Sequence, residues 1–342
     1  MVDNNTAKRN CTIDLIKGFA IILVLITHYS WTDEQRKLFV FPFVINMAIP
    51  VFMVITGYVY SLSLSKQGIN HIEDAFPMKM ILKRIVRYAL PFYAVIIWNL
   101  FDPHFQRLSL LEFLRWAIDG ADGPGSYYFP VMIQIVFVFP LVYFLINKKE
   151  GKGLLIAFIA NSVYELLAWS YGMPTTCYRL LMFRYVFLIA VGVYAFKGYK
   201  LKLWQSILTT IIGAAFIIIV VYFDYVPRIV NSDWSTTNFI SSMLIVPLMI
   251  WILQNHKNIR VMFLLPIEII GRASYHIYLV QMVYYLWYYY EFQRIVSTWY
   301  IHLILGIVIC LVLGVVWYYV DKPIQKVIGS IISGMTDTQQ QK

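Results

Sequence analysis

Charged residues are scarce in this chain. Asp, Glu, Lys and Arg make up 13% of its 342 residues, whereas hydrophobic residues make up 60%. Soluble domains carry about 25% charged residues. The shortage of charge argues against an ordinary soluble protein and predicts an all-α, polytopic membrane protein.

Cysteine is rare as well. Cys11, Cys177 and Cys310 are scattered in or beside apolar segments with no CxxC spacing, which argues against a disulfide framework and a zinc site. The histidines have no metal-ligand spacing, and we expect no metal. The sequence also lacks an internal repeat and a glycine-rich phosphate loop. Acidic residues are fewer than basic ones, giving a net charge of +10. In a membrane protein such an excess belongs to the cytoplasmic loops, so we expect no nucleic-acid partner.

Long apolar runs are abundant, and they predict about ten transmembrane helices in a single domain over residues 1–342. A short polar N-terminus (1–10) and a C-terminal tail (324–342) flank them. The predicted spans cover residues 11–31, 42–64, 86–101, 127–146, 153–171, 178–196, 204–223, 237–254, 264–290 and 299–320.

The basic residues alternate between the two sides of these spans. Of the 28 lysines and arginines, 18 fall in one set of loops and the termini, 7 in the other set and 3 within spans. Loops rich in Lys and Arg stay in the cytoplasm. The pattern therefore predicts a multi-pass cell-membrane protein with both termini cytoplasmic.

The first span contains ionisable side chains. Lys17 and His28 are eleven residues apart, so at about 100° per residue they share nearly one helix face, roughly 16 Å apart along the axis. Ionisable groups within a membrane usually mark functional sites, and histidine is suited to taking a proton near neutral pH. The alternative is that Lys17 reaches to the inner interface and His28 caps the outer one.

A basic run precedes the third span. Arg84 and Arg87 share a helix face at spacing i, i+3, and Lys83 is adjacent. Two guanidinium groups at the cytoplasmic surface suit a phosphate-bearing donor such as coenzyme A. The alternative is an ordinary membrane anchor that contacts anionic lipid.

Other segments favour structural interpretations. Thr56-Gly57 allows helices to approach closely. Gln134 is a polar group inside a span that needs a partner, for which an interhelical hydrogen bond is the simpler account. Glu268 and Arg272 are spaced i, i+4 and are expected to pair.

Five motifs in order resemble the acyltransferase 3 family of integral membrane O-acyltransferases, over nearly the whole chain. The family opens with a hydrophobic-Asp start and a basic residue that ten intervening residues separate from a histidine. A proline and Ser/Thr-Gly-Tyr/Phe motif, an Arg-x-x-Arg, a late Gly-x-x-Ser-Tyr motif and an acidic-basic-Pro ending follow. These appear as Asp14 with Lys17 and His28, Pro50 to Thr56-Gly57-Tyr58, Arg84 and Arg87, Gly271 with Ser274 and Tyr275, and Asp321-Lys-Pro323.

The resemblance implies transfer of an acyl group, usually acetyl, from cytoplasmic acyl-coenzyme A to a hydroxyl of a surface glycan or related acceptor. His28 is then the candidate general base, Arg84 and Arg87 with Lys83 bind the donor, and Lys17 contacts the thioester carbonyl or the coenzyme. His28 lies in the outer half of the span and the donor is inside. We therefore expect the donor's pantetheine arm to reach along the Lys17–His28 row.

The chain departs from the family pattern in places. Gln281 stands where a histidine is common, with His276 nearby instead, and Asp321 replaces a common Glu. Some relatives carry an extracytoplasmic hydrolase-like domain that completes transfer. The sequence contains none, so we expect this domain to finish the reaction or to pass the acyl group to a separate partner.

Two rival functions remain open at this stage. One is a non-catalytic transporter or flippase of a lipid-linked glycan or exopolysaccharide, and the other is a structural or sensing membrane protein. Loss of activity in a normally inserted His28→Ala variant separates the enzyme from both.

Overall fold

The computed structural model describes residues 11–99, 101, 109–255 and 264–339, and these residues form helices and loops without a strand. The predicted polar N-terminus, 1–10, lies outside the described residues. The α-helices are α1 (Cys11–Thr27), α2 (Asp33–Leu38), α3 (Ala48–Lys66), α4 (Met78–Asn99), α5 (Leu110–Ile118), α6 (Tyr128–Ser170), α7 (Thr175–Leu180), α8 (Val186–Phe196), α9 (Leu203–Tyr222), α10 (Val246–Asn255), α11 (Leu265–Arg272), α12 (Ser274–Val283), α13 (Tyr289–Ile295) and α14 (Trp299–Gln339).

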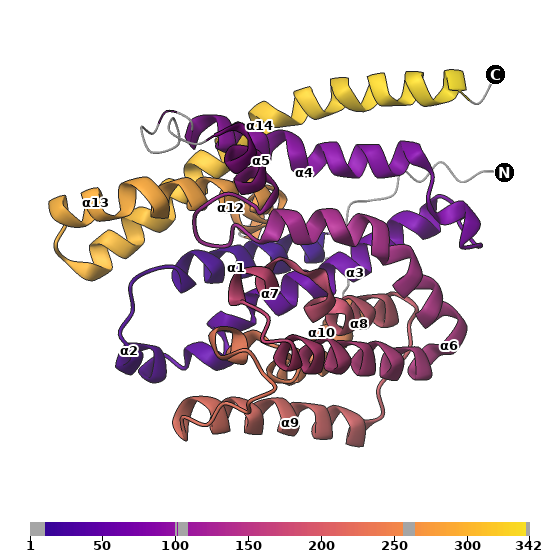
Figure 1. Ribbon diagram of the computed structural model, residues 1–342, viewed down its shortest axis with the longest axis horizontal. Coiled ribbons are helices and arrows are strands. Elements are labelled where there is room, and N and C mark those ends of the chain that lie inside the picture. The colour runs from indigo at the N-terminus through magenta and orange to yellow at the C-terminus, as the bar shows by residue number, and fades with distance from the viewer. Residues whose placement is uncertain (1–10, 100, 102–108, 256–263, 340–342) are drawn as a thin grey trace.

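Every predicted span overlaps one or more of these helices. The long helix α6 covers two of them, 127–146 and 153–171, and is interrupted between them. Glu150 there has φ 45° and ψ −121°, which no α-helix allows. The chain turns back at this point (Figure 1), so the polar stretch between the two predicted spans forms a turn.

Four helical stretches in the described ranges are long and apolar enough to cross a membrane: Phe41–Lys66, Tyr128–Ser170, Leu203–Tyr222 and Trp299–Met335. A fifth candidate is the pair Ser232–Leu244 and Val246–Asn255, bent by 55°. Large apolar side chains on α9 and α14, such as Ile211 and Ile304, are exposed. Because exposed apolar surface of this extent is stable in lipid, the chain is a membrane protein with an all-helical fold.

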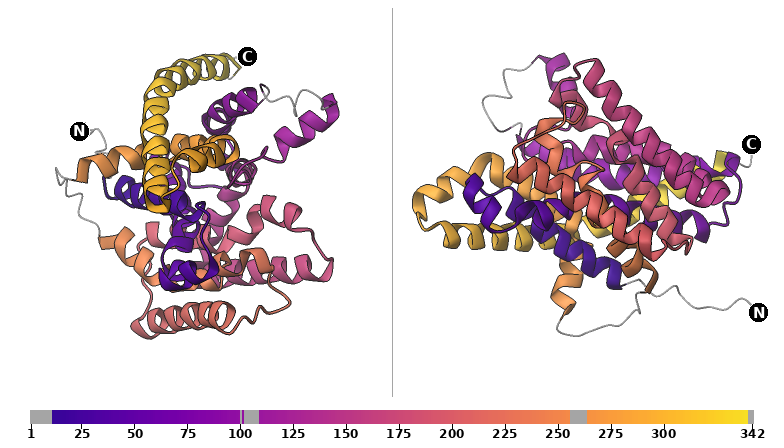
Figure 2. Two further views of the ribbon diagram at one scale, coloured as in Figure 1. Left: turned by 90° about the vertical axis from the view of Figure 1, so that its left-hand side faces the viewer. Right: turned by 90° about the horizontal axis from the view of Figure 1, so that it is seen from below.

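The C-terminal segment differs from the polar tail expected from the sequence. Helix α14 continues past Pro323 to Gln339 instead of ending near residue 320. Its last part turns away from the direction of the first part (Figure 2, left). A proline inside a helix removes one backbone hydrogen bond and commonly produces such a bend.

The helices run side by side, and the start of α4 and the end of α14 are both found on the right-hand side of Figure 1. The basic run of α4 and the C-terminal part of α14 are therefore neighbours, and Lys83 Nζ donates a hydrogen bond to Ser333 Oγ at 2.6 Å.

Glycines allow α3 and α8 to cross in direct backbone contact. A Cβ atom on Gly57 would collide with the carbonyl oxygen of Ile189, and one on Gly192 would collide with that of Val54. The close approach predicted for Gly57 is thus confirmed. Small residues at a crossing maximise van der Waals contact between helices where lipid supplies no hydrophobic driving force.

Replacing Gly192 by alanine is expected to destabilise the protein by about 1–3 kcal/mol, because the added methyl group must push two backbones apart. The measurement is the thermal unfolding midpoint in detergent. The matched control is Gly329→Ala, where an added Cβ meets no atom within 4 Å. Equal midpoints for the two variants would contradict the interpretation of the crossing.

Candidate active site

A cavity of about 1300 Å³ lies among α1, α3, α4, α12 and α14. It is lined by most of the site residues that the sequence predicts, although they come from distant parts of the chain. These residues are Asp14, Lys17, His28, Arg87, Ser274, Tyr275 and Asp321. The fold therefore brings residues of all five predicted motifs to a single space, Thr56 and Tyr58 representing the second motif.

An ion cluster places the start of α1 at this cavity. Arg272 Nε lies 3.4 Å from Asp14 Oδ2, and the other end of its guanidinium group contacts Glu268. The predicted Glu268–Arg272 pair is confirmed. Gly271 lets α11 touch the backbone of α1 at Asp14. Because Lys17 lies one helical turn beyond Asp14, this contact fixes its position on the cavity wall.

His28 follows directly after the last residue of α1. The hydroxyl of Tyr285 donates a hydrogen bond at 2.9 Å to the carbonyl oxygen of Leu25, one of the carbonyls left open at the helix end. The Tyr285 ring centroid is 6.1 Å from that of His28. Tyr285 belongs to a π-helical turn, Tyr284–Tyr288, and such turns are frequent at functional sites. The turn therefore holds the end of α1 and flanks the histidine.

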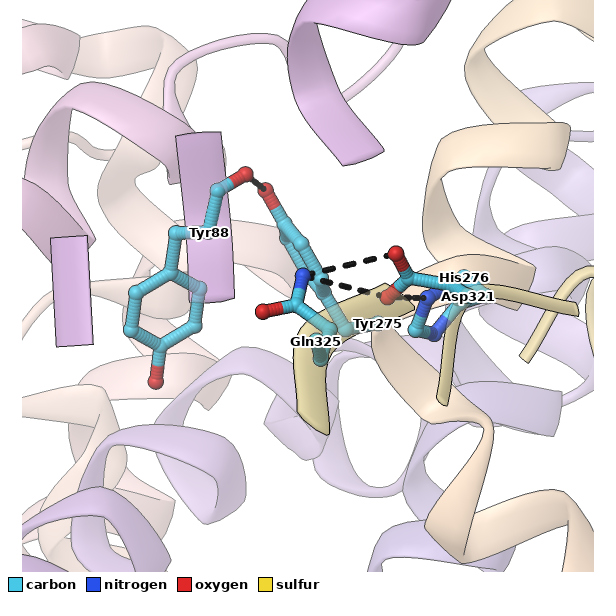
Figure 3. Close-up of polar contacts among 5 residues, drawn as sticks. All are labelled: Tyr88, Tyr275, His276, Asp321 and Gln325. Atoms are coloured by element: carbon cyan, nitrogen blue, oxygen red, sulfur yellow. Dashed lines mark hydrogen bonds and ion pairs between the residues drawn. The ribbon is translucent and has the colours of Figure 1, made fainter. Parts of the chain in front are cut away.

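A buried histidine–aspartate pair closes another part of the wall. His276 Nε2 and Asp321 Oδ2 are 2.9 Å apart, and Gln325 Nε2 donates to the same oxygen at 3.2 Å (Figure 3). His276 is 8% exposed and Asp321 is 5% exposed. The sequence assigned no role to His276, because 45 residues separate it from its partner and only the packing of α12 on α14 joins them.

Tyrosine side chains join α12 to α4 by hydrogen bonds. The hydroxyl of Tyr275 donates to the backbone carbonyl of Tyr88 at 2.8 Å (Figure 3). The hydroxyl of Tyr60 bonds that of Tyr88 at 3.2 Å. The residue before Tyr88 is Arg87, so these bonds hold its backbone at the edge of the cavity.

The three basic residues predicted to bind the donor line two different cavities. Lys83 and Arg84 line a second cavity of about 730 Å³, and Arg87 lines both cavities. Arg84 is 8% exposed, and its Cζ lies 4.2 Å from the centroid of the Tyr60 ring. Its Nη1 and Nη2 atoms are buried and have no hydrogen-bond partner. A buried guanidinium group without hydrogen-bond partners lowers the stability of the fold unless a ligand supplies those partners.

Gln134 lines neither cavity. Its Nε2 donates to the carbonyl of Leu180 at 2.7 Å, and its Oε1 accepts from the backbone N–H of Met182 at 3.1 Å. The amide therefore satisfies the irregular backbone just before α8. This placement favours the structural interpretation of Gln134 over a site role.

Two charged residues buried within predicted spans, Glu165 and Arg184, lie against one tyrosine. Tyr178 donates to Glu165 Oε1 at 2.7 Å, and Arg184 Cζ lies 4.9 Å from the Tyr178 ring centroid. Arg184 also lies 3.9 Å from the ring of Trp234, which lines the larger cavity. Aromatic faces stabilise a desolvated cation. The cluster therefore packs against Trp234 on the side away from the cavity and stabilises the cavity wall at that residue.

Across the described part of the chain, no cluster of three or more His, Cys, Asp or Glu could hold a metal ion.

Replacing Asp321 by asparagine is expected to lower the unfolding midpoint, because it removes the charged acceptor of a buried histidine. Loss of this acceptor lowers the free energy of unfolding by about 1–3 kcal/mol. The matched control is Glu291→Gln, since the Glu291–Arg294 pair is exposed and contributes little. Scanning fluorimetry in detergent compares the variants, and a larger shift for the control would refute the structural role of Asp321.

Comparison with known proteins bears on the chemistry of this cavity. Residues 12–320 match the family model described as an acyltransferase domain, which covers nearly the whole chain. Comparisons with curated proteins and with solved structures returned no match. The matched stretch contains all but one of the predicted site residues, Asp321 being the next residue after it. The chain therefore belongs to the acyltransferase 3 family.

Proposed function

We propose that this protein is a membrane O-acyltransferase. It moves an acyl group, usually acetyl, from acyl-coenzyme A to a hydroxyl of a cell-surface glycan, with His28 as the general base. The observation that carries the proposal is the single cavity that contains Lys17, His28 and Arg87 within a chain of this family. These are a candidate carbonyl contact, a candidate base and a candidate phosphate contact.

We propose further that the chain crosses the cell membrane about ten times with both termini in the cytoplasm. The position of the C-terminal helix supports a cytoplasmic C-terminus. The end of α14 lies beside the first part of α4 (Figure 1). That part of α4 contains the basic residues Lys79, Lys83 and Arg87, as expected for a cytoplasmic surface.

The donor enters from the end at which α4 begins. Its phosphates bind Lys83, Arg84 and Arg87, because guanidinium groups bind phosphate oxygens in a bidentate manner. The pantetheine arm then extends into the larger cavity past Lys17. Arg87 lines both cavities, so it marks the passage between the phosphate end and the reactive end of the donor.

At the other end of the cavity, His28 takes the proton of the acceptor hydroxyl. The hydroxyl oxygen attacks the thioester carbonyl, the new C–O bond forms, and the C–S bond breaks. The coenzyme leaves as its thiolate, which takes the proton from His28 to give the free thiol and the neutral histidine. A sugar hydroxyl is a weak nucleophile near neutral pH, so the base is needed. Lys17 stabilises the negative charge on the carbonyl oxygen.

His28→Ala is expected to lower the transfer rate by about 10²–10⁴, the range for loss of a general base. The assay follows radiolabelled acetyl transfer in sealed vesicles, with acetyl-coenzyme A on one side and crude surface glycan on the other. The control is His71→Ala, because His71 is an exposed loop residue outside both cavities. Full activity of a normally inserted His28→Ala variant would remove the general-base role, and transport that survives the change would favour a flippase.

The double variant Arg84→Ala/Arg87→Ala is expected to raise the donor concentration needed for half-maximal rate by about tenfold or more, because two charge-assisted contacts to phosphate are lost. The maximal rate should change less, since neither side chain acts on the reacting atoms. Rates are measured over a range of acetyl-coenzyme A concentrations. An unchanged donor requirement would argue against donor binding by this pair.

A further inference from the structure

The segment of α14 that follows its bend lies beyond the stretch matched by the family model, which ends at residue 320. This segment is packed beside the basic start of α4, to which the Lys83–Ser333 hydrogen bond ties it. Residues 322–333 are therefore fixed against the part of the protein that we propose to bind the donor.

The segment has two chemically different faces. At about 100° per residue, its lysines and serines fall within a sector of about 80°, and its large exposed apolar residues fall within a similar sector on the other side. A helix with one apolar and one basic face lies in the membrane interface. The polar face comprises Lys322, Lys326, Ser330 and Ser333, and the apolar face comprises Ile324, Val327, Ile331 and Met335.

The polar face forms one wall of the second cavity. Lys326, Ser330 and Ser333 line it from α14, opposite the basic residues of α4. The cavity lining, taken over the part of the chain that the structure describes, contains lysines and arginines from α4 and Lys326 from α14 but no Asp or Glu. A space lined by cations from both sides, without a carboxylate to neutralise them, is suited to a multiply charged anion.

The guanidinium group of Arg84 at this cavity has hydrogen-bond donors that a ligand would satisfy. The guanidinium of Arg84 is more than nine-tenths buried, and both its terminal nitrogens lack a hydrogen-bond partner. Burying such donors unpaired is costly, whereas a phosphate oxygen would satisfy them. The cationic lining and this orphaned guanidinium indicate the same kind of occupant independently.

The two cavities adjoin each other. Arg87, Gln325 and Lys326 line both of them. Gln325 also donates to Asp321 of the buried histidine–aspartate pair. A molecule with a polyanionic head and a long neutral arm could occupy both cavities at once, with its head between α4 and α14.

We propose that the C-terminal segment of α14 is the second wall of the donor's phosphate site, with Lys326 and Ser330 contacting the coenzyme phosphates opposite Arg84 and Arg87. This inference rests on the proposed function, in which the donor is acyl-coenzyme A. It assigns donor recognition to residues outside the matched domain.

The test is equilibrium binding of coenzyme A and of pantetheine to the full-length protein in detergent without anionic lipid. Lys326→Gln is expected to weaken coenzyme A binding by about tenfold, the effect of losing one charge-assisted contact, and Lys326→Glu to weaken it further. Pantetheine, which has no phosphate, should bind both variants as it binds the wild type. The control is Lys149→Gln, an exposed lysine that lines neither cavity.

Three results would overturn the inference in distinguishable ways. If the wild type binds coenzyme A and both Lys326 variants bind it equally well, the α14 wall is not part of the site. If the Lys326 variants bind coenzyme A as the wild type does but bind less well to vesicles that contain phosphatidylglycerol, the occupant is a lipid headgroup. If the wild type binds no coenzyme A, the proposed donor is wrong and the inference fails with it.

Discussion

The contact between Arg272 and Asp14 is the constraint on which the site depends. Two carboxylates and one guanidinium group share a mostly buried position, where each charge requires a partner. Gly271 allows α11 to approach α1 closely enough for the charges to meet. Because this junction fixes the start of α1, it also fixes the position of Lys17, and the remaining walls of the cavity are packed around that helix.

The sequence predicted the helical segments and most of the cavity, since hydropathy and motif spacing are local signals. It placed Lys17 and His28 on one face, and both line one cavity. It could not pair His276 with Asp321, because that contact depends on how α12 packs against α14. Gln134 was expected to have a hydrogen-bond partner within the membrane, and its partners are backbone atoms that the sequence does not reveal.

In the proposed function, the two cavities divide donor recognition from reaction. Within the described part of the chain, the smaller cavity is lined by basic residues without a carboxylate, whereas the larger one is lined by basic residues together with Asp14 and Asp321 and by many aromatic side chains. The hydrogen bond from Tyr275 to the backbone at Tyr88 joins α12, in the wall of the larger cavity, to α4, which lines both cavities.

The π-helical turn at Tyr284–Tyr288 has a consequence for the evolution of this chain. A π turn accommodates one more residue than an α-helical turn of the same height. Deleting one residue there would restore regular α-helical winding and change which side chains of the turn face α1. Tyr285 would then leave the carbonyl of Leu25, and the end of α1 would lose its anchor. Length in this short stretch is therefore constrained even where individual side chains are free to vary.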